Sequence, residues 1–151
     1  YRASGNQFVF QTGRVLKFYG TPFCHAPGSF VTYDTKTKTL FSSDLFGSYD
    51  ANWDLFVQLT PACQDCVAQQ TCPQTGKACP LYHIGEFQKR IMTSNQALNH
   101  ALDVLDPIDI ECIAPQHGGI LRGKEDVKTA LAYLRGIGDV GIEYYASENL
   151  L

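Results

Sequence analysis

Three residues of this chain carry side chains that bind metals in proteins, and each follows an apolar, strand-like run. They are His25, Asp44 and His117. Imidazole and carboxylate groups form the ligand sets of non-haem iron and of zinc sites. Proline or glycine stands near each residue, and loops of this kind at strand ends often carry function. One such histidine alone is equally well explained as a surface residue, but all three together favour a metal site. Since the ends of parallel or mixed strands meet at one sheet edge, we expect the three side chains to cluster.

A second group of metal-binding residues is the pattern Cys63-x2-Cys66-x5-Cys72-x6-Cys79, which holds four of the six cysteines. In a chain without a secretory signal, this density favours a metal over disulfides. Four thiolates suit an iron–sulfur cluster or a zinc ion. The alternatives are free thiols or a thiol switch between the first two cysteines. His83 follows closely and is an alternative ligand.

The segments around His25, Asp44 and His117 resemble the metallo-β-lactamase-fold domain of flavodiiron proteins and of related oxygen-binding di-iron proteins. The resemblance rests on a His-then-Pro loop, on the stretch LFSSDLFG at residues 40–47 and on the sequence PQHG at residues 115–118. In that family the first histidine binds one iron, the aspartate bridges both irons and the last histidine binds the second iron. The resemblance implies these roles for the three residues here.

The resemblance also implies an α+β fold of the αββα type, in which two similar halves face each other. That family has a further His- and acid-rich motif upstream, whereas this chain has no histidine before His25. We therefore expect residues 1–151 to form one half of the sandwich, a mixed sheet with flanking helices. Residues 60–83 are expected to be a cysteine-rich, metal-binding insertion. An upstream half-domain or another chain is expected to complete the metal site, and a start at Tyr1 rather than Met favours a preceding segment.

The leading functional hypothesis is a non-haem di-iron protein that binds or reduces dioxygen or nitric oxide. The reductases of the family take electrons from FMN on a flavodoxin-like domain, for which this sequence has no counterpart. A cysteine-ligated cluster could supply electrons instead. Two alternatives stay open: a di-iron module that senses oxygen or redox state without turnover, and a zinc-dependent hydrolase of the same fold. A redox partner or a signalling domain is expected in the first two cases.

The bulk composition is that of a globular protein. The chain has 151 residues, 44% of them hydrophobic and 18% charged, with a formal net charge of −3. This length fits one domain with a sizeable core. The charge leaves no basic surface for nucleic acid, and no apolar run is long enough to span a membrane. Without a visible signal peptide, the expected location is the cytoplasm.

Hydrophobic periodicity predicts the elements that must position these residues. Strand pairs are expected at residues 7–12 with 14–19 and at 29–33 with 39–43, the second joined by a hairpin loop at 34–38. Helices are expected at 50–59, 86–105 and 124–134, a buried strand at 108–114, and a short tail at 142–145. Asp50 is the expected N-cap of the first helix, Pro107 follows the end of the second, and Gly136 closes the third.

The remaining cysteines, aromatics and histidine near these elements have ordinary structural explanations. Cys24 and Cys112 lie in apolar contexts and are expected to pack as small hydrophobic residues. Three aromatic residues close to the candidate site are expected to fill the core, and the alternative is that they exclude water around bound dioxygen. They are Phe23, Tyr33 and Phe46. His100 is expected to be a solvated or packed helix residue.

Overall fold

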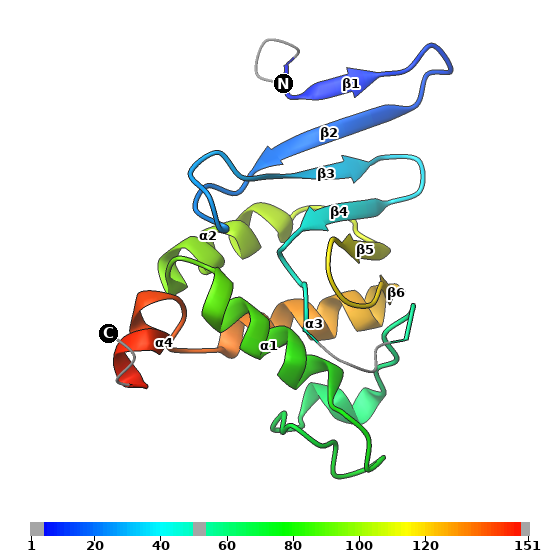
Figure 1. Ribbon diagram of the computed structural model, residues 1–151. Helices are drawn as coiled ribbons and strands as arrows, with labels where there is room; N and C mark the ends of the chain where they lie inside the picture. Colours follow the sequence, from blue (N-terminus) through cyan, green and yellow to red (C-terminus); the bar gives the residue numbers. More distant parts are fainter. Residues whose placement is uncertain (1–4, 50–53, 149–151) are drawn as a thin grey trace.

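A computed structural model describes residues 5–49 and 54–148 and shows one six-stranded sheet with helices beside it (Figure 1). The strands are β1 (Gln7–Val9), β2 (Val15–Gly20), β3 (Phe30–Asp34), β4 (Thr39–Ser43), β5 (Cys112–Pro115) and β6 (Leu121–Arg122). The helices are the 3-10 helix η2 (Pro61–Gln64), α1 (Pro80–Ile91), α2 (Asn95–Leu105), α3 (Lys124–Gly136) and α4 (Ile142–Ser147). Within the described residues, no helix has the length and apolar character needed to cross a membrane.

The strands lie in the sheet in the order of the sequence. Strands β1 to β4 form an antiparallel meander, β5 joins β4 in parallel, and β6 pairs with β5 antiparallel. The two predicted strand pairs are therefore confirmed. The parallel step between β4 and β5 requires a long crossover, which contains the cysteine-rich stretch and helices α1 and α2.

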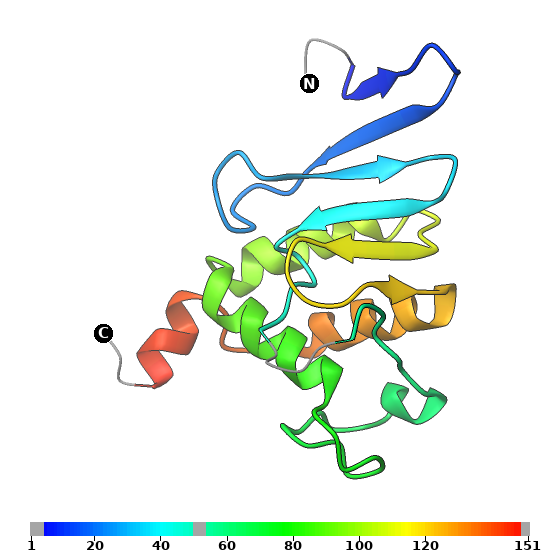
Figure 2. The same cartoon turned by 45° about the vertical axis from the view of Figure 1, so that its right-hand side comes forward.

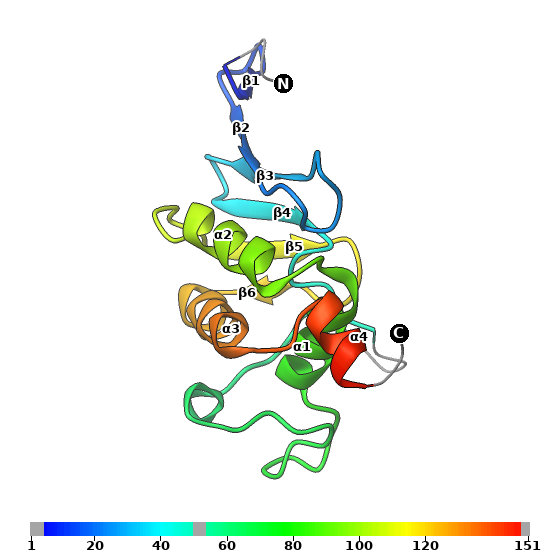
Figure 3. The same ribbon diagram turned by 90° about the vertical axis from the view of Figure 1, so that its left-hand side faces the viewer.

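The two faces of the sheet differ in what covers them. Helices α2 and α3 lie against one face, and none of the helices in the described residues covers the opposite face (Figures 2 and 3). Leu40 and Ile113 are fully buried, whereas Phe41, next along β4, is 47% exposed. Side chains alternate between the faces of a strand, so the apolar residues of β4 and β5 build the core on the helical side only. The predicted mixed sheet with flanking helices is confirmed.

The predicted long helix at residues 86–105 is wrong in its extent, because the structure has two helices there. Helix α1 starts earlier, with Pro80 in its first turn, and ends at Ile91. Helix α2 then begins at Asn95, where the Ser94 hydroxyl accepts a hydrogen bond of 3.2 Å from the amide of Ala97. Apolar residues continue at helical spacing across the break, so periodicity alone did not reveal it. The N-cap serine marks the break.

Two further predicted elements differ from the structure. The predicted N-cap Asp50 lies outside the described residues, and residues 54–59 are extended rather than helical. Phe56 forms a parallel bridge with Ile120, and the amide of Val57 donates to the Ile120 carbonyl at 2.9 Å. The predicted strand at 108–114 is shorter than expected, with only 112–115 paired in the sheet.

Helix α3 packs against α1 and α2, and the start of helix α4 packs against residues 92–94, which join α1 to α2. Helix α3 agrees with its prediction, and the predicted tail is helix α4. Gly141, which precedes α4, has a φ of +70°, and a Cβ there would lie 2.2 Å from the Thr93 carbonyl oxygen. Only glycine allows α4 to approach the joint this closely.

A buried carboxylate organises the hairpin between β3 and β4. Asp34 was predicted to be a loop residue but is fully buried at the end of β3. It accepts hydrogen bonds from the guanidinium of Arg14, the hydroxyl of Thr37 and the amide of Lys36. These donors, with Arg14 first, hold the pKa of the Asp34 carboxyl well below its ordinary value. The carboxylate therefore ties strand β2 to the hairpin.

Asp34→Ala should lower the free energy of unfolding by about 2 kcal/mol, because it removes a buried carboxylate that accepts charge-assisted hydrogen bonds from Arg14 and a further bond from the Lys36 amide. Since folding lowers the pKa, this stability is present above about pH 4, near the unfolded pKa, and is lost as pH falls through the lower folded pKa. Urea denaturation of both proteins across pH would measure it. Asp109→Ala is the matched control: Asp109 is 56% exposed and pairs with two lysines, so its loss should cost clearly less stability than the loss of Asp34. Equal losses for both variants would contradict the prediction.

Candidate metal centre

The sheet topology brings three loops to one edge. His25 lies in the loop between β2 and β3, Asp44 directly follows β4, and His117 follows β5. Strand β3 runs antiparallel to β4, so the start of β3 and the end of β4 lie side by side at the same end of the strands. Strand β5 runs parallel to β4 and therefore ends at that edge too. The structure thus brings the three predicted side chains together.

Each oxygen of the Asp44 carboxylate faces a different imidazole. Nε2 of His25 lies 2.9 Å from Oδ2, and Nε2 of His117 lies 3.5 Å from Oδ1. The Asp44 side chain is only 14% exposed, whereas the His25 and His117 side chains are 50% and 46% exposed. The carboxylate thus sits at the floor of the site, with the two imidazoles beside it and open to solvent.

This donor set fits part of a two-metal site. A carboxylate can bridge two metal ions through its two oxygens while an imidazole serves each ion. Within the described part of the chain, however, no group of three or more His, Cys, Asp or Glu side chains is arranged so that it could hold a metal ion by itself. The role of His25, Asp44 and His117 as ligands stays a prediction, and a stable centre needs further ligands.

The turn that carries Asp44 is held from below by a glutamine that the sequence analysis missed. Gln88 in helix α1 is fully buried, and its Nε2 donates to the Asp44 carbonyl at 3.0 Å and to the Gly47 carbonyl at 3.3 Å. Within the described residues, its Oε1 has no hydrogen-bond partner. Leu81 and Ile84 are also buried on α1, on the same side of the helix as Gln88. A glutamine at a helical spacing from these apolar residues was therefore the sequence signal that could have revealed it.

The loop that carries His117 is held by backbone bonds and by aromatic rings. The Ser48 amide donates to the His117 carbonyl at 3.2 Å, which joins this loop to the one after Asp44. The rings of Phe87 and Tyr49 lie 6.0 Å and 6.3 Å from the imidazole. Gly118, with a φ of +89°, gives the turn its conformation. These contacts fix the position of the loop while leaving the imidazole half exposed.

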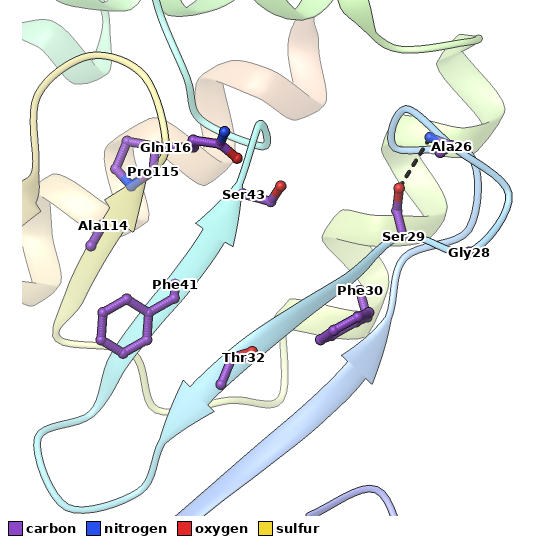
Figure 4. A pocket seen from close by; sticks show the side chains of 10 residues that line it. All are labelled: Ala26, Gly28, Ser29, Phe30, Thr32, Phe41, Ser43, Ala114, Pro115 and Gln116. Carbon is purple, nitrogen blue, oxygen red and sulfur yellow. Dashed lines mark hydrogen bonds between the residues drawn. The ribbon is translucent and has the colours of Figure 1, made fainter. Parts of the chain in front are cut away.

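An open groove lies over strands β3, β4 and β5 (Figure 4). Its volume is about 580 Å³. Ala26, Ser43 and Gln116 line it, and each is the sequence neighbour of one of the three candidate ligands. Phe30 and Phe41, which are 40% and 47% exposed, line the groove over β3 and β4. The groove therefore combines an apolar floor with an end at the candidate metal ligands.

The four clustered cysteines lie in the irregular segment below helices α1 and α3 (Figure 1). All six cysteines of the chain are free thiols, and the four are not gathered into a metal-holding group among the described residues. They are nevertheless close to one another. Partial burial raises the pKa of Cys66, and the charges of Cys79, Cys72 and Cys63 raise it further.

The other cysteines and His100 behave largely as expected. Cys24 is 4% exposed, its thiol donates to the Ala97 carbonyl at 3.3 Å, and burial raises its pKa to about 11. Cys112 is half-buried, and burial raises the pKa of its thiol as well. His100 is exposed on helix α2.

The expected aromatic core is only partly correct. Phe46 and Tyr33 are buried, at 1% and 8% exposure. Phe23 is 50% exposed, because it lies in the turn before His25 with a φ of +64°. Its ring therefore belongs to the surface beside the site, not to the core.

Comparison with known proteins identifies the family. The family model described as ODP family beta lactamase matches residues 1–118. The chain belongs to the ODP family. The matched range contains all three candidate ligands and the whole cysteine-rich segment. The resemblance seen in the sequence and the metallo-β-lactamase-like fold are both confirmed.

Solved structures and curated sequences agree with this membership. The chemotaxis sensor ODP, solved as a peroxy diiron species, superposes with a TM-score of 0.74 at 27% identity and covers 96% of this chain and 53% of its own. Rubredoxin oxygen:oxidoreductase from Desulfovibrio gigas gives a TM-score of 0.61 at 26% identity, over 80% of this chain and 27% of its own. The type A flavoprotein fprA of Rhodobacter capsulatus is 32% identical over 117 residues, which are 72% of this chain and 21% of that protein. This ODP-family chain thus spans about half the length of the sensor and about a fifth of the flavoprotein.

Proposed function

We propose that this chain supplies part of a non-haem di-iron centre that binds or reduces dioxygen or nitric oxide. The observation that carries the proposal is the Asp44 carboxylate, whose two oxygens face the imidazoles of His25 and His117 at 2.9 Å and 3.5 Å. His25 and His117 would each bind one iron, and Asp44 would bridge the pair. When bound, the irons would supply redox-active metal ions able to take up a small diatomic ligand. Likeness to the sensor ODP and to an oxygen oxidoreductase supports this assignment.

The surrounding residues of this chain have positioning and shielding roles in the proposal. Gln88 holds the carbonyl of Asp44 and so fixes the turn that presents the carboxylate. Tyr49 and Phe87, whose ring centroids are 4.5 Å apart, lie beside His117. Aromatic rings at this distance limit the access of water to one side of the site. The other side opens to the groove, where the remaining ligands have to arrive.

We further propose that a second half-domain supplies those ligands, from the same longer polypeptide or from another chain. The uncovered sheet face supports this, since Phe30 and Phe41 form an exposed apolar surface that ends at the candidate ligands. Packing a second sheet on this face would bury the aromatic residues and close the site, as in sheet-on-sheet sandwiches. The length of the sensor ODP, of which this chain covers about half, supports the same arrangement.

The iron content of two preparations tests both proposals. The native protein, purified without oxygen together with any partner chain that stays bound, should hold two irons, whereas residues 1–151 expressed alone should bind iron weakly and incompletely. Two tightly bound irons on residues 1–151 alone would contradict the need for a second half-domain. A native product that holds only zinc, and hydrolyses an ester or lactam, would replace the di-iron proposal with the zinc hydrolase.

Oxygen uptake by the reduced native product distinguishes a reductase from a sensor. Continuous uptake in the presence of an electron donor indicates turnover and a redox partner. Uptake that stops at one dioxygen per iron pair, with a change in the visible spectrum, indicates a sensory module that acts with a signalling domain. The same experiment with nitric oxide compares the two ligands. Absence of any spectral change with either gas would overturn the proposed gas binding.

The cysteine-rich insertion has an accessory role in this proposal. An iron–sulfur cluster at Cys63, Cys66, Cys72 and Cys79 would exchange electrons with the di-iron centre or report the redox state. A zinc ion at the same thiols would only stabilise the fold of the insertion. Visible absorption that dithionite bleaches in a protein lacking the His25 and His117 side chains would support the redox role.

A further inference from the structure

The second half of the cysteine-rich segment forms a small hairpin that presents two thiols on one face. Thr71 pairs with Ala78 in an antiparallel bridge. The Cys72 amide donates to the Lys77 carbonyl at 2.7 Å, and the Cys79 amide donates to the Gln70 carbonyl at 3.1 Å. In this register Cys72 and Cys79 are diagonal neighbours on the same face, a relation that places residues about 7–8 Å apart. A centre between them could draw both thiols together.

The first half of the segment directs its cysteines toward the same region. Cys63 lies in the 3-10 helix η2, and Cys66 follows three positions later. Cys66 lies just beyond the end of this helix, and both thiol-bearing residues face a common pocket. Cys63 lines a cavity of about 580 Å³ together with Cys72 and Cys79, and it lines a second pocket of about 210 Å³ together with Cys66. Cys63 therefore connects the two arms of the cysteine pattern.

The segment has little packing of its own to hold this arrangement. None of the residues in η2 is buried, and Val67 is 79% exposed. The thiols form no disulfide. Small units with so few buried apolar groups are commonly held together by disulfides or by a bound metal. A metal at four thiolates would supply that folding energy directly.

We infer that Cys63, Cys66, Cys72 and Cys79 together bind one thiolate-preferring metal centre, either a zinc ion or an iron–sulfur cluster. The centre is distinct from the histidine–aspartate site and does not depend on iron there. It joins the turn at η2 to the hairpin at residues 71–78. Cys79 is also the N-cap residue of helix α1, so the centre anchors the start of the helix that carries Gln88. Cysteine is the metal-binding residue type that residues 63–66 and residues 72–79 have in common.

The test measures metal and acid-labile sulfide in the native gene product carrying His25→Ala and His117→Ala, purified without oxygen. Removing the two imidazoles separates this proposal from the di-iron proposal. We expect one zinc per chain, or iron with matching sulfide, to remain. Cys66→Ser and Cys72→Ser in this background should each remove at least nine-tenths of that metal. Cys112→Ser, which changes a half-buried cysteine outside the segment, should retain it. Unchanged metal content in both segment variants would overturn the proposal.

Two further measurements keep the proposal falsifiable if a serine variant fails to fold. In the unsubstituted protein, four fewer thiols should react with a disulfide reagent before metal removal than after it, and equal numbers would contradict the inference. His83→Ala tests the fourth ligand, because His83 lines the same cavity as Cys63, Cys72 and Cys79. The His83→Ala protein should keep its metal at the four cysteines. Loss of metal from His83→Ala with retention in Cys66→Ser would replace the four-cysteine centre with a three-cysteine, one-histidine site.

Discussion

Replacing Asp44 with alanine is expected to abolish iron binding at the candidate site. The carboxylate faces both imidazoles, one with each oxygen, and its side chain is 14% exposed. Without it, the two irons would lose the ligand that bridges them. From this chain, each iron would keep one solvent-exposed imidazole. Iron content of the native gene product, purified without oxygen and measured by elemental analysis, should fall from two per molecule to nearly none.

The controls for this substitution separate lost charge from lost structure. Asp44→Asn keeps the shape of the side chain but removes its negative charge, so it should also lose most of the iron while the fold is retained. Asp103→Ala removes a carboxylate that is 66% exposed on a helix surface and should leave iron content unchanged. Full iron occupancy in Asp44→Ala would remove the residue from the proposed ligand set, and the di-iron assignment would lose the observation that carries it.

The second large effect is expected from Gln88→Ala. This change leaves the Asp44 and Gly47 carbonyls without their donor and opens a cavity where a fully buried side chain had been. Together these costs amount to a loss of about 3 kcal/mol in the free energy of unfolding. Because Gln88 holds the turn that presents Asp44, iron affinity should also fall by about 10–100-fold, as for other residues that orient metal ligands. Urea denaturation and iron titration of the reduced protein measure the two effects.

Comparison of these two effects shows whether Gln88 positions the ligand or only supports the fold. Gln88→Glu keeps the size and shape of the side chain but replaces the Nε2 donor with an oxygen, so it should weaken iron binding as alanine does. Gln96→Ala changes an exposed glutamine on α2 and should alter neither stability nor affinity by a measurable amount. A Gln88→Ala protein that is destabilised but binds iron normally would show a structural role alone.

Local patterns in the sequence predicted the strands and the site they position. The pair around Gly13 and the hairpin at 34–38 were recognisable because alternating apolar and β-branched runs were separated by turn residues. Helix α3 was recognisable for a similar reason, with glycine near its end. His25, Asp44 and His117 could be proposed as one site because each follows a strand, and strand ends converge wherever the sheet is mixed.

Features that depend on contacts between distant segments were not predictable in this way. The break between α1 and α2 lies within a continuous apolar pattern, and what marks it is the hydrogen bond from Ala97 to Ser94. The segment at 54–59 is extended because it pairs with Ile120, a residue far along the chain. Asp34 is a residue type typical of loops, but it is buried at the end of β3, where it pairs with Arg14 from the turn before β2.

The sequence by itself determined the ligand types of the candidate site and their spacing, which follow from residue chemistry, and most of the strands and helices, which follow from periodicities of two and 3.6 residues. The class of fold came from the family resemblance that residues 40–47 and 115–118 carry. Only the tertiary structure decided that each Asp44 oxygen faces its own imidazole, that Gln88 supports the turn, and that one face of the sheet is left open. The physical reason is that these features arise from long-range packing: helix α1 lies beneath the β4 turn only after the crossover has folded back onto the sheet. No local pattern encodes that approach.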